Sequence, residues 1–117
     1  MALAKETLQD VQLVVGTEVT LYGPDINPGV YRCRVDLSAL LTGDTVQLRK
    51  KVVCNPGSTV NTAALLEEII TVNGPTTDPT PAMYPFLTTD SNYSITYTAK
   101  QTAGTARKVS IAVMRLV

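Results

Sequence analysis

Apolar and polar residues alternate most regularly in two stretches in the first half of the chain. Val30–Leu37 places its apolar side chains on one side and its charged side chains on the other, and Thr45–Cys54 repeats this pattern. A period of two residues is typical of a strand with one buried and one solvated face. We expect the two strands to form a hairpin through the loop Ser38–Asp44, with Leu37 opposite Val46, which puts both apolar sets on one face.

Shorter alternating stretches, separated by clusters of Gly, Pro, Asn and Asp, indicate further strands. The last two are expected to pair as a hairpin through the loop Gln101–Ala106. The predicted strands outside the central hairpin are about Val11–Val15, Glu18–Tyr22, Leu65–Val72, Met83–Leu87, Tyr93–Lys100 and Arg107–Val117.

The stretch Ala63–Val72 fits either a helix or a strand. Its Leu and Ile residues recur at helical spacing, whereas its end, Ile69–Val72, carries the β-branched residues that favour strands. Periodicity cannot decide for so short an apolar run. We expect a strand from about Leu65, because the neighbouring elements are all predicted strands.

Together these elements predict an all-β protein with a single domain, an antiparallel β-sandwich with a jelly-roll-like fold. A chain of 117 residues has the usual size of one domain and can bury a core without a metal or a disulfide. Residues 1–9 are expected to form an N-terminal arm, frayed or in one helical turn, ahead of the sandwich domain 10–117. The order of the strands does not follow from the pattern.

The charge balance argues against some classes of partner. Ten Lys and Arg residues cancel ten Asp and Glu residues, so no net charge draws the chain to nucleic acid or to an anionic membrane. No apolar run of about 18 residues could span a membrane, and Met1–Asp10 lacks the apolar core of a secretion signal. We therefore expect synthesis in the cytoplasm, with no nucleic-acid or membrane partner.

The residue types argue against an enzyme. The sequence has no His, the commonest general base and metal ligand, and no glycine-rich phosphate loop. Glu67 and Glu68 are adjacent, so on a strand their carboxylates point to opposite faces and cannot share a substrate. Asp90 and Asn92 offer too few oxygens for Ca²⁺ and fit a turn better. We expect no catalytic residue, cofactor or metal.

The two cysteines, Cys33 and Cys54, are expected to be free thiols. In the hairpin register Cys33 faces the neighbourhood of Lys50, which puts its Cα roughly 13 Å from that of Cys54. A disulfide requires less than about 7 Å. Without a His in the chain to activate a thiol, neither cysteine is a candidate nucleophile.

The outward face of the central hairpin carries the first candidate partner-binding residues. In the expected register Arg32 lies opposite Lys51, and Arg34 lies opposite Arg49. Like charges in opposite positions destabilise a sheet. Either carboxylates of a neighbouring element neutralise these four residues, or they bind an anionic partner, such as an acidic protein surface or a sulphated or phosphorylated glycan. The candidate carboxylates are Asp36, Glu67 and Glu68.

The predicted C-terminal strand, Arg107–Val117, is apolar on both faces, which is typical of a central strand. Its outer face carries Met114 and Leu116. This face is either covered by the second sheet or exposed as an apolar patch that marks a contact with another molecule. Met114 and Leu116 therefore join the four basic residues as candidate partner-binding residues.

Two stretches resemble a known group of proteins. Tyr31–Leu48 contains the pattern YxCxVDLS followed by LTGDTVxL, and Thr98–Arg107 reads TAKQTAGTAR. The pair is similar to small β-sandwich proteins encoded in the structural gene clusters of tailed bacteriophages, among them head-decoration (cement) proteins.

The resemblance implies a non-enzymatic virion structural protein, foremost a capsid decoration protein that binds and stabilises the phage head shell. It implies the lattice of the major capsid protein as a partner, a homotrimer, and location in the virion after synthesis in the host cytoplasm. The competing hypothesis is a carbohydrate- or receptor-binding β-sandwich module of a phage fibre or a secreted enzyme, which the absence of Trp disfavours. A scaffold subunit of a cellular machine is a third hypothesis.

Overall fold

The computed structural model describes residues 2–27, 29–53, 55, 59–60, 65–75, 86–88 and 94–117. In this part of the chain no helix is long and apolar enough to cross a membrane. The strands are β1 (Leu3–Gln12), β2 (Glu18–Asp25), β3 (Val30–Asp36), β4 (Thr45–Val53), β5 (Leu65–Asn73), β6 (Phe86–Thr88), β7 (Ser94–Ala103) and β8 (Lys108–Leu116).

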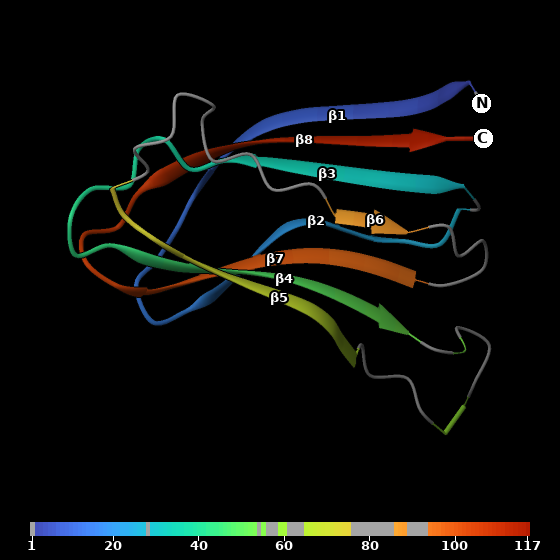
Figure 1. The fold of residues 1–117 in the computed structure, drawn as a ribbon. Helices are drawn as coiled ribbons and strands as arrows, with labels where there is room; N and C mark the ends of the chain where they lie inside the picture. The colour runs from blue at the N-terminus through green and yellow to red at the C-terminus, as the bar shows by residue number, and fades with distance from the viewer. Residues whose placement is uncertain are drawn as a thin grey trace.

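The strands build two four-stranded sheets (Figure 1). Sheet I has the order β1-β8-β3-β6 and sheet II the order β2-β7-β4-β5, and all neighbouring strands are antiparallel. This winding of eight strands between two facing sheets is that of a jelly roll. The prediction of an all-β, antiparallel, jelly-roll-like sandwich is confirmed.

The central hairpin predicted between Val30–Leu37 and Thr45–Cys54 is wrong. β3 lies in sheet I, where it pairs with β8 and β6, and β4 lies in sheet II, where it pairs with β7 and β5. The connection crosses from one sheet to the other and buries Leu37 and Leu40 on the way. Alternation shows which side of a strand is buried. It does not show whether two such strands pair in one sheet or face each other across the core, because both arrangements bury the same side chains.

The hairpin predicted for the last two strands is wrong for the same reason. β7 lies in sheet II between β2 and β4, whereas β8 lies in sheet I between β1 and β3. The prediction that the C-terminal strand is central is confirmed, because β8 pairs along both edges. The strand predicted from about Leu65 is also confirmed, as β5.

The structure shows no boundary between an arm 1–9 and a domain 10–117. β1 runs through this position and pairs with β8 from Leu3 to Gln12, so the arm expected to be frayed or helical is an edge strand. Most side chains of β1 are exposed on both of its sides. Because neither side has to be apolar, the alternation that marks the other strands is missing here.

The core lies between the two sheets, where the inward side chains of β3 and β4 join those of β7 and β8. Along β3, buried and half-buried residues alternate, as the sequence pattern predicted. The core residues are Leu13, Leu21, Tyr31, Cys33, Val35, Leu37, Leu40, Val46, Leu48, Val72, Ile95, Tyr97, Ala99, Val109, Ile111 and Val113.

Candidate functional site

The outer face of sheet I, called the arginine face below, brings together four of the six predicted partner-binding residues, Arg32, Arg34, Met114 and Leu116. The buried residues of β3 and β8 point into the core, so the alternate side chains point outward. Strand pairing arranges the outward side chains of β1, β8 and β3 in rows across the sheet. The rows are Glu6–Met114–Arg32, Leu8–Ala112–Arg34 and Asp10–Ser110–Asp36.

A shallow groove of about 450 Å³ crosses this face where the central strand carries small side chains. Ser110 and Ala112 of β8 occupy its middle, and Arg34 of β3 lies on one side. The groove is wide enough for a side chain or a short chain segment of a partner. The lining residues are Leu8, Gln9, Asp10, Arg34, Asp36, Ser110, Ile111 and Ala112.

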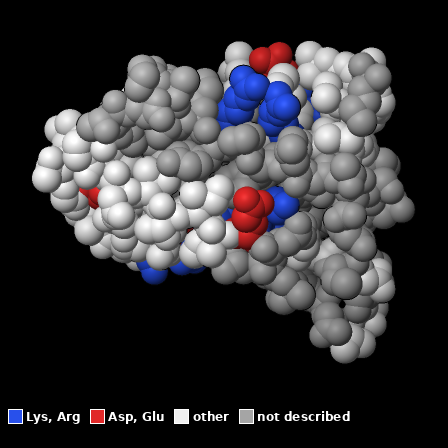
Figure 2. Space-filling view, viewed as in Figure 1, with Lys and Arg blue, Asp and Glu red and all other residues white. Residues whose placement is uncertain are grey.

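Arg32 and Arg34 are half-buried. Neither guanidinium group forms an ion pair or a hydrogen bond with another described residue. The nearby carboxylates bind other groups: Asp10 accepts a hydrogen bond of 2.6 Å from Ser110 Oγ, and Asp36 accepts one of 2.9 Å from the Ser38 N–H. Figure 2 shows one group of Lys and Arg side chains at the top of the molecule, where Figure 1 places sheet I, and others in the middle and at the lower left. The guanidinium donors are therefore available to an anionic group.

Met114 and Leu116 are half-buried on the arginine face. Sheet II packs against the other side of β8, which carries Val109, Ile111 and Val113. The alternative that the second sheet covers the outer face of this strand is therefore wrong.

Arg49 and Lys51 lie apart from the arginine face, on the outer face of sheet II. The predicted opposition of these residues to Arg34 and Arg32 is wrong, because the two pairs belong to different sheets. Arg49 Nη1 forms an ion pair of 3.0 Å with Glu18 Oε2, and Lys51 Nζ binds Glu18 Oε1. No local pattern indicated this partner, because Glu18 reaches β4 across the intervening strand β7.

The pKa of Glu18 reflects this neutralisation. The hydrogen bond from Lys51 lowers it most, partial burial opposes the shift, and hydrogen bonds from Arg49 and Thr98 lower it further. Of the two interpretations of the basic residues, internal neutralisation thus describes Arg49 and Lys51. It does not describe Arg32 and Arg34 within the residues that the structure describes.

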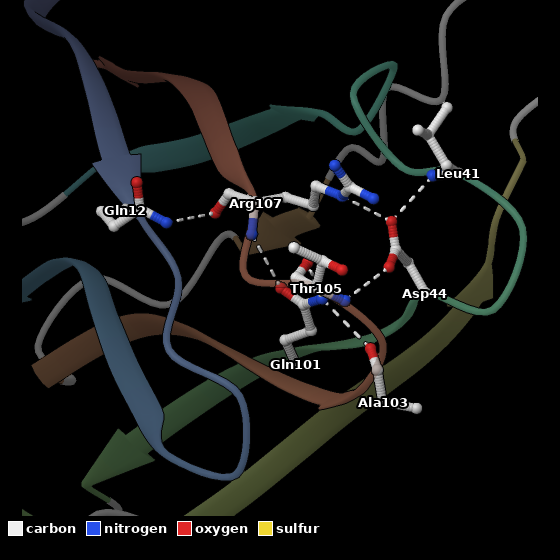
Figure 3. Close-up of polar contacts among 7 residues, drawn as sticks. All are labelled: Gln12, Leu41, Asp44, Gln101, Ala103, Thr105 and Arg107. Atoms are coloured by element: carbon white, nitrogen blue, oxygen red, sulfur yellow. Dashed lines mark hydrogen bonds and ion pairs between the residues drawn. The ribbon is translucent and has the colours of Figure 1, made fainter.

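The two stretches that carry the phage resemblance meet in one polar cluster (Figure 3). Asp44 accepts hydrogen bonds from the backbone N–H of Leu41 at 2.8 Å and of Thr105 at 3.0 Å, and its Oδ2 lies 2.7 Å from Arg107 Nε. The bonds from Leu41 and Arg107 hold the pKa of Asp44 below its ordinary value. Asp44 thereby ties the β3–β4 connection to the β7–β8 connection.

Gln101 is the second centre of this cluster and is fully buried. Its Nε2 donates to the carbonyls of Ala103 at 3.0 Å and Thr105 at 2.6 Å, and its Oε1 accepts from the Arg107 N–H at 3.1 Å. These three bonds satisfy backbone groups at the end of β7 and in the β7–β8 connection.

Gly104 completes the loop. Its φ of +92° is a left-handed conformation that favours glycine, and a Cβ at this position would overlap the carboxylate of Asp44. Asp44, Gln101 and Gly104 therefore explain the GDT and KQTAGT patterns as a clamp between two connections, with no need for a ligand.

A second polar cluster closes the end of β2. Tyr22 Oη and the Asn27 side chain both donate to Asp25, which is only 7% exposed, and Lys5 Nζ lies 5.5 Å from the centre of the Tyr22 ring. Residues of this cluster line a pocket of about 320 Å³. The Asp25 carboxylate is already saturated with donors, so this cluster is a structural one.

Cys33 is free, as predicted, and it is fully buried, whereas Cys54 lies outside the described residues. Burial raises the pKa of the Cys33 thiol to about 12, which keeps it protonated at neutral pH. In a Cys54→Ser variant we therefore expect no reaction of the native protein with a thiol-reactive dye, and full labelling once urea unfolds it. Rapid labelling in native buffer would show that the core opens at β3.

The comparisons with known proteins add no relative. No protein-family model matches the sequence, and no curated protein is similar to it. Among the described residues, no group of three or more His, Cys, Asp or Glu side chains could hold a metal ion.

Proposed function

We propose that this protein is a non-enzymatic structural protein of a tailed-phage particle, which docks on the lattice of the major capsid protein and stabilises the head shell. The docking surface in this proposal is the arginine face. The observation that carries it is the pair Arg32 and Arg34 on one face of β3: Arg34 lines the open groove, and neither arginine has an ion partner among the described residues. A single carboxylate of a capsid subunit would find its partner in Arg32 or Arg34 there.

The rest of the fold supports a passive, rigid role. The Asp44–Gln101 clamp holds two connections at one end of the sandwich, so the residues that carry the phage resemblance serve to fix the scaffold. The alternative of a carbohydrate-binding module gains nothing from the groove, because none of the described residues that line it is aromatic.

The test is co-sedimentation of the purified protein with empty shells, assembled from the capsid protein encoded in the same structural gene cluster. Saturable binding to shells, together with no binding to a glycan array, is the expected result. Binding to sugars without binding to shells would overturn the proposal in favour of the carbohydrate-binding module.

The Arg34→Glu variant is expected to weaken shell binding at least about tenfold, because it replaces a guanidinium donor in the groove with a carboxylate. The matched control is Lys100→Glu, which makes the same change of charge on sheet II. Equal affinities of the two variants would contradict docking through the arginine face.

A further inference from the structure

β1 forms a free edge of sheet I. Within the described part of the chain it pairs only with β8, and Figure 1 shows it as the outermost strand of its sheet. The strand carries two large exposed apolar side chains: Leu3 is 54% exposed and Leu8 68% exposed. An edge strand of this length presents a row of unpaired backbone donors and acceptors.

The other edge strands differ from β1 in ways that hinder pairing. The register of β2 shifts twice, between Thr20 and Tyr22 and again before Asp25, and Pro24 removes a backbone donor from it. β6 has only three residues. The register of β5 shifts between Leu66 and Glu68, and this strand carries two adjacent glutamates, which hinder the addition of another strand. β1 contains neither Pro nor Gly, and its register is regular after the shift between Leu3 and Lys5. It is the edge best suited to accept another strand.

We infer that a second copy of this chain adds its own β1 to this edge, antiparallel, about a two-fold axis that passes beside Thr7. The axis stands perpendicular to the sheet, so the sheet continues from one copy into the other. In such a pair, directly opposite residues point to the same face. The two-fold axis must therefore pass between one residue and the same residue of the second copy. Thr7 and Leu8 lie at the middle of β1, so these two choices pair the largest part of the strand.

Side-chain charge decides between these two registers. Centred on Leu8, the pairing puts Glu6 opposite the second copy's Asp10, and two carboxylates in opposite positions repel. Centred on Thr7, it puts Glu6 opposite the second copy's Leu8 and Lys5 opposite the second copy's Gln9. No like charges meet in that register. The strand is thus complementary to itself in one register.

The inference does not depend on the proposed function, but it has a consequence for it. A two-fold axis perpendicular to sheet I leaves both arginine faces exposed on the same side of the extended sheet. Two identical docking faces on one rigid body would raise the apparent affinity for a repeating lattice. A homotrimer, which the phage resemblance implies, does not arise from this edge alone, because two-fold strand pairing closes with two copies.

The test is cysteine cross-linking of the full chain in a Cys54→Ser background. Directly opposite residues of paired strands have Cα atoms about 4.5–5.5 Å apart, within the range of a disulfide. Thr7→Cys is therefore expected to give a covalent dimer under mild oxidation. Leu8→Cys is the matched control: it lies one residue away and is expected to stay largely monomeric. Cross-linking through Leu8→Cys and not through Thr7→Cys would overturn the register.

Sedimentation equilibrium tests the association without a cross-link. The wild type is expected to form a dimer, and Thr7→Lys is expected to raise its dissociation constant at least about tenfold by placing two ammonium groups opposite each other. An unchanged thermal unfolding curve at low concentration shows that the variant folds. A wild type that stays monomeric, forms a trimer, or dimerises equally well with Thr7→Lys would overturn the inference. Arg34→Glu should leave the dimer intact, which separates this test from that of shell binding.

Discussion

Replacing Gln101 with alanine is expected to lower the free energy of unfolding by about 3 kcal/mol. The side chain is fully buried, and its loss leaves the carbonyls of Ala103 and Thr105 and the N–H of Arg107 without their partner. Each buried polar group left unsatisfied costs about 1–3 kcal/mol, and partial entry of water reduces the sum. The truncation also leaves a cavity between the two connections.

Urea unfolding followed by circular dichroism measures this loss. Thr102→Ala is the matched control: it changes the next residue of β7, whose side chain is exposed, and surface changes of this kind stay within about 0.5 kcal/mol. A Gln101→Ala variant as stable as Thr102→Ala would show that the clamp does not hold the end of the sandwich.

The clamp also shows what a sequence resemblance can and cannot reveal. Asp44 and Gln101 lie far apart in the sequence, in the two stretches that the resemblance singled out, and the fold brings them into one cluster. Their pattern is explained by backbone groups that need partners. The pattern therefore carries information about the fold. Arg32 and Arg34 occupy the two unspecified positions of YxCxVDLS, so the resemblance says nothing about the arginine face.

The buried sides of the strands were predictable, but their neighbours were not. Alternation in β3 correctly separated the core residues from Arg32 and Arg34. It could not show that β3 and β4 lie in facing sheets, because both arrangements bury the same sides. The available signal was Leu40 within the predicted loop Ser38–Asp44: an exposed hairpin loop has no reason to carry this apolar residue, which the structure buries.

The partners of charged residues were the least predictable feature. Glu18 neutralises Arg49 and Lys51 from two strands away, a relation that requires the strand order of sheet II. The pairing of β1 with β8 was missed because both faces of this edge strand are solvated, so its sequence does not show the alternation of apolar and polar residues that marks a half-buried strand. Both failures concern long-range neighbours, on which local patterns carry no information.

Replacing Asp25 with asparagine is expected to lower the free energy of unfolding by about 2 kcal/mol at neutral pH. Burial by itself raises the pKa of the Asp25 carboxyl, but hydrogen bonds from Tyr22 and Asn27 outweigh it and lower the pKa from 3.8 to about 2. The folded state therefore binds the carboxylate form more strongly than the unfolded state does. This difference is worth about 2 kcal/mol when the group is ionised.

The sign of the pH dependence follows from the lowered pKa. The contribution of Asp25 is complete above about pH 4 and is lost as the pH falls towards 2. Glu18 and Asp44, whose pKa values are also lowered, add to the acid sensitivity of the wild type. Urea unfolding at a series of pH values should therefore show a smaller loss of stability on acidification for Asp25→Asn than for the wild type.

A double-mutant cycle with Tyr22→Phe isolates the interaction that produces this shift. Phenylalanine keeps the ring beneath Lys5 and removes only the hydroxyl that donates to Asp25. If that donor stabilises the ionised carboxylate, the two substitutions are non-additive, and combining them costs less than the sum of the single changes. Additive losses, or an acid dependence of Asp25→Asn equal to that of the wild type, would mean that the carboxylate is not held by the Tyr22 hydroxyl and that the end of β2 is stabilised by packing alone.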